Sequence, residues 1–130
     1  MLRTAFPEGV TSPVHERDVA AIAVRALLDD THRRMAYLVL GAGLLTTREQ
    51  VAAIAEALGE PVRLDEVHVA IYRSELLTQL PEVVVERLVQ SRGQVRQVPA
   101  ELGTDAVPEV LGRHALTFAE WARDHAADFR

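Results

Sequence analysis

The sequence predicts a mostly helical α/β fold with five or six helices and two or three short strands. Three features of the 130 residues support this prediction. Apolar residues recur at helical spacing in several segments. One short apolar run has the continuous pattern of a strand that is buried on both faces. No repeat, low-complexity segment or long linker divides the sequence, so we expect a single domain over residues 1–130.

The chain opens with an extended lead-in and a helix. Residues 1–13 contain two prolines and a glycine, which predicts an extended segment with a short strand near Gly9–Ser12. A helix is predicted for Arg17–Asp29, and a turn follows it. Asp18 or Glu16 is the expected cap, because an acidic side chain accepts hydrogen bonds from free N–H groups at a helix start.

A strand and a second helix come next. Ala36–Gly41 reads AYLVLG, a continuous apolar run that predicts a buried strand of a parallel sheet. The helix after it has apolar residues three and four apart, and Gly59 and Pro61 mark its end. Two capping boxes fit its start: Thr46 with Glu49, and Thr47 with Gln50.

The rest of the chain is predicted to be mainly helical. The expected elements are a short strand at 61–67, a helix at His68–Leu80, a helix from Pro81, a polar loop at 91–104 and a short helix at Asp105–Gly112. The inward residues of the two longer helices are expected to be Ile71, Leu76, Leu77, Val84, Val85, Leu88 and Val89. The last helix begins at a capping box, Thr117 with Glu120, and its apolar face holds Phe118, Trp121, Ala122 and His125, with Phe129 below.

Composition argues against several classes of function. The net charge is −5 and no basic stripe is present, so we expect no nucleic-acid partner. Cysteine is absent and the histidines lack metal-ligand spacing, so we expect no metal site. The longest uncharged apolar stretch, Met35–Leu45, is too short to span a bilayer, and no signal-peptide pattern begins the chain. A cytoplasmic protein without a membrane partner is the expectation.

The first helix and the buried strand both need cover that the other predicted elements do not obviously supply. From Val19 to Leu28 the helix holds one charge, Arg25, so it is apolar nearly all round. A strand that is buried on both faces also needs neighbours for its backbone groups. A second copy of the chain is the simplest source of cover, so we expect a homodimer.

Four motifs, taken in order, resemble a known family. They read VHERDVAAIAVRALL, YLVLGAGLLTTREQVAAIAEALGEPVR, LPEVVVERLV and LGRHALTFAEWARDHAADF. From about Pro7 to Phe129 the chain resembles the C-terminal part of NmrA-like, NAD(P)H-binding proteins, which are atypical extended short-chain dehydrogenases/reductases. The closing motif is typical of bacterial members. The resemblance implies that the helix at Asp18–Leu28 packs against a Rossmann sheet, with Ala36–Gly41 beside it.

The sequence lacks the motifs with which this family holds its cofactor. Family members carry a G-x-x-G-x-x-G turn that presents backbone amides to the pyrophosphate. Here Gly41–Leu45 contains only a G-x-G, and no Tyr-x-x-x-Lys pair exists because the chain has no lysine. The resemblance therefore implies a substrate-side half without a dinucleotide-binding half. No cofactor of its own is expected, and NAD(P) only if a separate Rossmann-half subunit supplies the site.

Four side chains are candidate substrate contacts: His15, Arg17, Tyr72 and Arg73. The first two belong to the densest polar cluster, where family substrates approach the sheet, and a histidine beside carboxylates can act as a general base. The structural alternative is helix capping by Asp18 with solvated neighbours. Tyr72 and Arg73 lie in a region that walls the pocket in the family, and ordinary packing is their alternative.

Three functions remain open as hypotheses. The first is a small-molecule-binding or interaction module without its own dinucleotide site. The second is one subunit of a split NAD(P)-dependent reductase. The third is a cofactor-free cyclase or isomerase of a biosynthetic pathway, with His15 or Tyr72 as acid or base.

Overall fold

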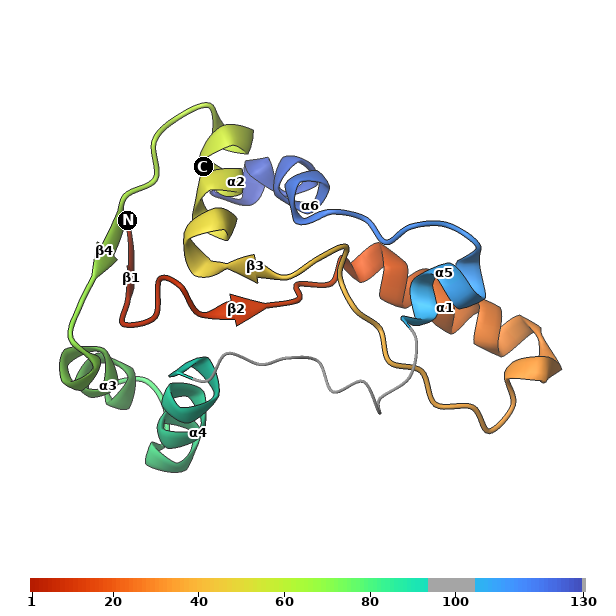
Figure 1. Cartoon of the computed structure of the whole chain (residues 1–130), viewed down its shortest axis with the longest axis horizontal. Helices are drawn as coiled ribbons and strands as arrows, with labels where there is room; N and C mark the ends of the chain where they lie inside the picture. The colour runs from red at the N-terminus through yellow and green to blue at the C-terminus, as the bar shows by residue number, and fades with distance from the viewer. Residues whose placement is uncertain (94–104, 130) are drawn as a thin grey trace. The chain divides into compact units, whose positions relative to one another are not determined.

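The computed structural model describes residues 1–93 and 105–129, and this part of the chain is mostly helical with short strands (Figure 1). Its contacts divide it into two compact units. Unit 1 holds residues 1–11 and 45–93, and unit 2 holds residues 12–44 and 105–129. Most of the loop predicted at 91–104 lies outside the described residues, and its first three residues are helical.

Two short strand pairs belong to unit 1. β1 (Leu2–Thr4) pairs in parallel with β4 (Leu64–Glu66), and β2 (Val10–Thr11) pairs antiparallel with β3 (Leu45–Thr46). The strands predicted near residues 9–12 and 61–67 are therefore confirmed. β1 was not predicted, because its partner is remote in sequence and a local pattern does not show such a pairing.

Unit 1 also holds three helices: α2 (Thr47–Leu58), α3 (Val69–Leu77) and α4 (Glu82–Gly93). Of the two possible capping boxes, Thr46 with Glu49 is the one that forms. Gly59 ends α2 in the left-handed region, with φ 71°, as predicted. Val85 is fully buried, whereas Ile71 and Val84 are exposed, so the prediction that these two point inward is wrong.

Unit 2 is built on α1 (Glu16–Leu28), α5 (Ala106–Leu111) and α6 (Phe118–Asp124). Two 3₁₀ turns complete it, η1 (Asp30–His32) and η3 (Ala126–Phe129). α1 and α5 lie side by side (Figure 1). Their contact buries Ile22 against Ala106 and Val107, with Tyr37 and Val39 packed around this core. The predicted helix at Asp105–Gly112 and the second capping box, Thr117 with Glu120, are confirmed.

Two expectations for unit 2 are wrong. The cap of α1 is His15, whose Nδ1 accepts from the backbone N–H of Arg17, rather than Asp18 or Glu16. The cap is the extended residue directly before the first helical one, and that position falls on His15. Ala36–Gly41 forms no strand in the described part of the chain, because no neighbouring strand pairs with it.

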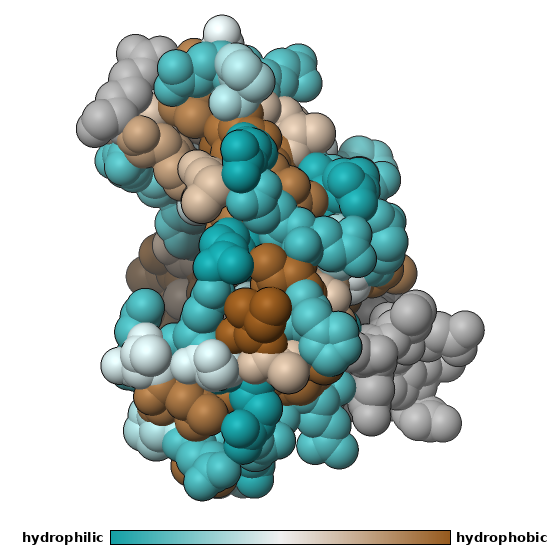
Figure 2. Space-filling view, turned by 90° about the vertical axis from the view of Figure 1, so that its left-hand side faces the viewer, coloured by the Kyte–Doolittle hydropathy of each residue, from teal (hydrophilic) through white to brown (hydrophobic). Residues whose placement is uncertain are grey.

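Apolar side chains also reach the surface. On the face shown in Figure 2, apolar atoms interrupt the polar surface. In unit 2 the exposed apolar residues concentrate on α1: Val19, Val24, Leu27 and Leu28. Within the described ranges no helix combines the length and the hydrophobicity that a membrane crossing requires.

Candidate functional site

The start of α1 carries the polar cluster that the sequence singled out. The His15 side chain is 1% exposed, and its Nδ1 accepts a hydrogen bond from the N–H of Arg17 at 3.3 Å. In a neutral ring the proton then sits on Nε2, which lies 3.4 Å from Asp124 Oδ2 and makes no hydrogen bond among the described residues. Arg17 reaches the same Asp124 oxygen at 2.9 Å. This geometry favours a structural role for His15.

Asp18 is the buried anchor of the cluster. Its carboxylate is fully buried, and each oxygen accepts one hydrogen bond. Oδ1 accepts from Arg113 Nη2 at 2.6 Å, and Oδ2 accepts from the backbone N–H of Leu116 at 2.8 Å. Asp18 thus ties α1 to the segment between α5 and α6, 95 residues further along the chain.

A histidine bridge joins the start of α1 to the end of α6. His125 Nε2 lies 2.7 Å from Glu16 Oε1, and its Nδ1 lies 2.7 Å from Asp128 Oδ2. Two flanking carboxylates favour the imidazolium, so the hydrogen bond to Glu16 first and that to Asp128 second raise the pKa of His125. The same bond to His125 lowers the pKa of Glu16. Trp121 stacks on the His125 ring at 4.9 Å, as the shared helix face predicts.

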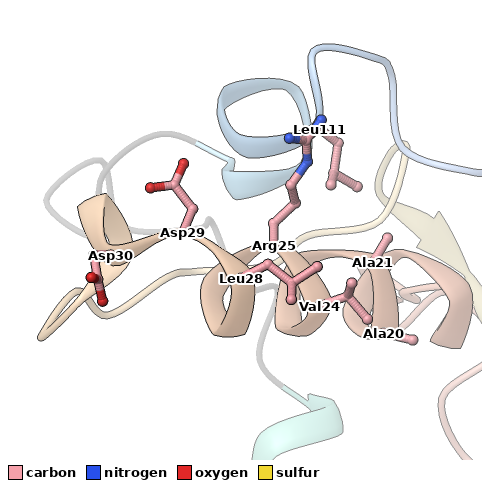
Figure 3. Close-up of a pocket in the computed structure, with 8 residues that line it drawn as sticks. All are labelled: Ala20, Ala21, Val24, Arg25, Leu28, Asp29, Asp30 and Leu111. Atoms are coloured by element: carbon pink, nitrogen blue, oxygen red, sulfur yellow. The ribbon is translucent and has the colours of Figure 1, made fainter.

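An open hollow of about 710 Å³ runs along α1 (Figure 3). Its wall is mainly apolar and includes one residue of α5. The lining residues are Ala20, Ala21, Val24, Arg25, Leu28, Asp29, Asp30 and Leu111. Figure 3 shows the Arg25 side chain extending toward Leu111. The hollow therefore offers an apolar surface with charge at one end.

The described residues that line the hollow include charged side chains but no histidine. Its ionisable groups are one arginine and two aspartates. Asp29 Oδ1 accepts from the N–H of Thr31 at 2.9 Å, and this hydrogen bond lowers the pKa of the Asp29 carboxyl. These groups suit binding or docking rather than proton transfer.

Tyr72 and Arg73 lie on α3 in unit 1. The Tyr72 ring meets Phe6 edge to face at 6.0 Å, and its hydroxyl has no hydrogen-bond partner among the described residues. Arg73 contacts Glu86 at 2.5 Å and Glu82 at 3.0 Å, and its pKa is raised chiefly by the hydrogen bond to Glu86. The four predicted substrate contacts are thus grouped in two pairs, one in each unit.

Neither the segment Gly41–Leu45 nor the start of α2 fits a pyrophosphate. A Cβ on Gly41 would lie 1.8 Å from the Pro13 carbonyl oxygen, so close packing against the backbone explains this glycine. A Cβ on Gly43 would meet nothing within 4 Å. The first amides of α2 are already bonded: the Glu49 N–H donates to Thr46, and the backbone carbonyls of Pro7 and Gly9 accept from two others. A pyrophosphate finds no free helix start at this place.

Sequence reasoning missed the partners that complete the polar cluster. Asp124 and His125 stand in the tail WARDHAADF, which was read only as an apolar helix face. Arg113 stands in the LGRHA segment directly after α5. The sequence does contain a signal for a polar site, because an aspartate and a histidine adjoin a predicted helix end. The local sequence does not indicate which distant helix these two side chains contact.

Comparison with known proteins places these features in context. No family model matches the chain. The chain is 35% identical over 129 residues to the (4-alkanoyl-5-oxo-2,5-dihydrofuran-3-yl)methyl phosphate reductase of Streptomyces griseus; the match covers 99% of this chain and 46% of the reductase. It is 38% identical over 127 residues to the NAD(P)H azoreductase of Xenophilus azovorans, covering 94% of this chain and 43% of the azoreductase. The chain thus spans less than half the length of these curated relatives.

Solved structures give the same picture of the fold. The triphenylmethane reductase of Citrobacter sp. matches 98% of this chain with a TM-score of 0.69 and 18% identity, over 44% of its own length. The NADPH-dependent quinone oxidoreductase of Escherichia coli matches 98% with a TM-score of 0.67 and 21% identity, over 46% of its length. The chain therefore has the fold of the C-terminal portion of NmrA-like reductases, and its curated relatives include a reductase and an NAD(P)H azoreductase.

Proposed function

We propose that this chain forms the substrate-side part of an NAD(P)H-dependent reductase and acts as a small-molecule-binding or interaction module that does not itself hold the dinucleotide. The observation that carries the proposal is the identity of 35% and 38%, over nearly the whole chain, to two reductases. The poor fit of Gly41, Gly43 and the start of α2 to a pyrophosphate supports the second half of the proposal.

The names of the two relatives suggest a substrate class. An (alkanoyl-oxo-dihydrofuranyl)methyl phosphate and an azo compound each contain an electron-poor double bond. We therefore propose that the substrate is a small conjugated molecule that accepts hydride. Its body is largely apolar and suits a pocket with apolar walls. Tyr72 offers the hydroxyl best placed to donate to such a molecule, since no described residue binds it. His15, Arg17 and Arg73 are already paired within the chain, so they rank lower as substrate contacts.

A chimera tests the reductase function. The unmatched N-terminal part of the Xenophilus azovorans azoreductase is fused to the full 130-residue chain, and NADPH consumption is followed with an azo dye and with an alkanoyl-butenolide methyl phosphate. We expect NADPH oxidation that depends on acceptor and is absent from the azoreductase part alone. A chimera that binds NADPH but reduces neither acceptor would contradict the proposed function.

The isolated chain provides the second test. Because the segment around Gly41 and the start of α2 do not fit a pyrophosphate, 1 mM NADPH should leave the thermal unfolding midpoint of the chain unchanged. A midpoint that rises with NADPH concentration would show a dinucleotide site within these 130 residues, and the assignment to the substrate side would then be wrong.

A further inference from the structure

The ring of His125 is bonded at both of its nitrogens. Nε2 lies 2.7 Å from Glu16 Oε1, and Nδ1 lies 2.7 Å from Asp128 Oδ2. A neutral imidazole carries a proton on only one nitrogen, and an ionised carboxylate has no proton to donate. In a neutral ring, one nitrogen lone pair would therefore face a carboxylate oxygen at hydrogen-bond distance. The geometry thus requires the positively charged, doubly protonated form of His125.

The indole of Trp121 stabilises the same charge from the face of the ring. The two rings are stacked, with their centroids 4.9 Å apart and their planes inclined by 29°. A cation over an indole face within about 6 Å is attracted to the ring electrons. Trp121 also meets Phe129 edge to face at 6.2 Å. The charged His125 ring is therefore held by two carboxylates and one indole.

The segment His125–Phe129, which we call the latch, has few other attachments. Most of it is η3, a 3₁₀ turn, and such turns are short and weakly hydrogen-bonded. Within the latch the Asp128 N–H donates to the His125 carbonyl, and the His125 N–H donates to the Trp121 carbonyl. Among the described residues, one polar contact joins the latch to α1, and it is the contact between His125 and Glu16.

Other charged groups surround this contact and hold α6 to α1 independently of it. Arg17 lies 2.9 Å from Asp124 Oδ2, and His15 Nε2 lies 3.4 Å from the same oxygen. His15 Nδ1 lies 3.3 Å from Glu16 Oε2 but accepts from a backbone N–H. Because Arg17 is paired and His15 serves as an acceptor, neither replaces the charge of His125. The titratable and charged groups around the latch come from α1, α6 and η3: His15, Glu16, Arg17, Glu120, Asp124 and Asp128.

We propose that the latch is a pH-operated switch within unit 2. While the His125 ring is charged, the latch is held on the start of α1. Loss of one ring proton turns an attractive contact into a repulsive one, so the latch detaches, whereas α6 stays joined to α1 through Arg17 and Asp124. Detachment exposes the Trp121 face that the ring covers and frees Glu16. Because the switch involves neither a substrate nor a dinucleotide, it does not depend on the proposed function.

Trp121 is the only tryptophan of the chain, so its fluorescence reports the latch directly. Quenching by acrylamide is measured on the full 130-residue chain from about pH 5.5 to about pH 8.5, the range in which histidines titrate. We expect the quenching constant to rise about twofold as the latch opens, with its midpoint at the His125 pKa measured by NMR. Circular dichroism should show no loss of helix, because the opening is local. Constant quenching, a different midpoint, or a rise that accompanies loss of helix would each contradict the proposal.

Asp128→Asn separates opening of the latch from a simple effect of the ring charge on fluorescence. The amide N–H of an asparagine can donate to the lone pair of a neutral ring, while the opposite ring N–H donates to Glu16. We therefore expect this variant to stay closed at about pH 8.5, with the low quenching that the unchanged protein shows at about pH 5.5. Quenching that rises with pH as it does in the unchanged protein would contradict the proposed repulsion between Asp128 and the neutral ring.

Two histidine variants complete the test. His125→Gln cannot carry the charge, so its quenching should be high and independent of pH. The matched control is His114→Gln, which changes an exposed histidine whose side chain makes no hydrogen bond or ion pair with the described residues. This control should retain the pH dependence of the unchanged protein. A dependence that survives in His125→Gln, or disappears in His114→Gln, would assign the transition to another group and overturn the proposal.

Discussion

Asp18 bonds with both carboxylate oxygens to residues far along the chain, and this makes it the residue on which unit 2 depends most. Asp18→Ala would leave the N–H of half-buried Leu116 without its acceptor, and would leave Arg113 only its bond to the His114 carbonyl. A lost hydrogen bond to a charged group costs about 1.5–3 kcal/mol, so we expect the free energy of unfolding to fall by about 2–3 kcal/mol. Urea unfolding, monitored by circular dichroism, measures this change in the free energy of unfolding.

The control for Asp18 is an exposed aspartate of the same unit. Asp30 lies at the surface and pairs with Arg33 at 3.1 Å. An exposed pair of this kind contributes little, so Asp30→Ala should change the free energy of unfolding by less than about 0.5 kcal/mol. Equal effects of the two substitutions would show that Asp18 is not an anchor.

The His125 bridge predicts a pH dependence with a defined sign. The folded pKa of His125 is raised above its ordinary value of 6.5, so its stabilising contribution is fully present below pH 6.5 and is lost as the pH rises through the folded pKa. The pKa of Glu16 is lowered from 4.5, so its contribution is present above pH 4.5 and is lost as the pH falls through its folded pKa. The bridge is therefore strongest between about pH 4.5 and 6.5.

His125→Gln tests this window. The thermal midpoint of the variant should fall furthest below that of the unchanged protein near pH 5.5, and the two should converge as the pH rises above 8. An NMR titration of His125 should give a pKa above that of a free histidine. A difference between the two proteins that grows with rising pH would contradict the assignment of the bridge.

At the scale of the elements, the start of α2 shows which of two predicted capping boxes the structure forms. Two overlapping capping boxes fitted its start, and Thr46 is the residue that caps it, with Glu49 bonding back to its backbone N–H. The N–H of Thr47 bonds to the carbonyl of Gly9 instead. The choice between the two capping boxes depends on where β3 ends. The pairing of β3 with β2 determines that end, and the local sequence does not show this pairing.

The prediction for α2 uses these two adjacent threonines. Thr46→Ala removes the acceptor for the Glu49 N–H, and the free energy of unfolding should fall by about 1 kcal/mol. Thr47→Ala keeps the backbone bond to Gly9, so its effect should stay below about 0.5 kcal/mol. Urea unfolding of both variants decides between the boxes, and a larger loss with Thr47→Ala would reverse the assignment.

The elements that sequence predicted correctly are those that local chemistry determines. Helix starts with a capping residue and helix ends with glycine were placed within a few residues, as at Thr117 and Gly112. β1 was missed because it pairs with a strand 62 residues away. The continuous apolar run Ala36–Gly41 predicts a strand that is buried on both faces. Strand structure, however, requires neighbours, and the described chain supplies none.

The candidate site was predictable only in part. The polar cluster at the start of the first helix is visible in the sequence, which predicts Asp18 or Glu16 as the cap. The cap is His15, and Asp18 is a buried anchor that the sequence does not predict. Arg113, Asp124 and His125 could not be assigned, because their contacts join segments about a hundred residues apart. The expectation of an uncovered first helix did come from sequence, and the exposed leucines of α1 confirm its physical basis.

At the scale of the whole molecule, the two faces of α1 should contribute very differently to stability. Ile22 on the inner face is buried against α5, so Ile22→Ala should cost about 2–4 kcal/mol. Leu27 and Leu28 on the outer face are more than 80% exposed. Replacing both with glutamine should change the free energy of unfolding by less than about 0.5 kcal/mol each, because they are in water before and after folding.

Replacement of Leu27 and Leu28 with glutamine should also weaken the binding of an apolar dye to the chain. Because Leu27 and Leu28 are the most exposed leucines of the described chain, their replacement should lower the fluorescence of bound 8-anilinonaphthalene sulfonate, whereas Thr47→Ala should leave it unchanged. An outer-face variant that loses as much stability as Ile22→Ala would show that the chain already covers these leucines in solution. In that case α1 would have no uncovered apolar face.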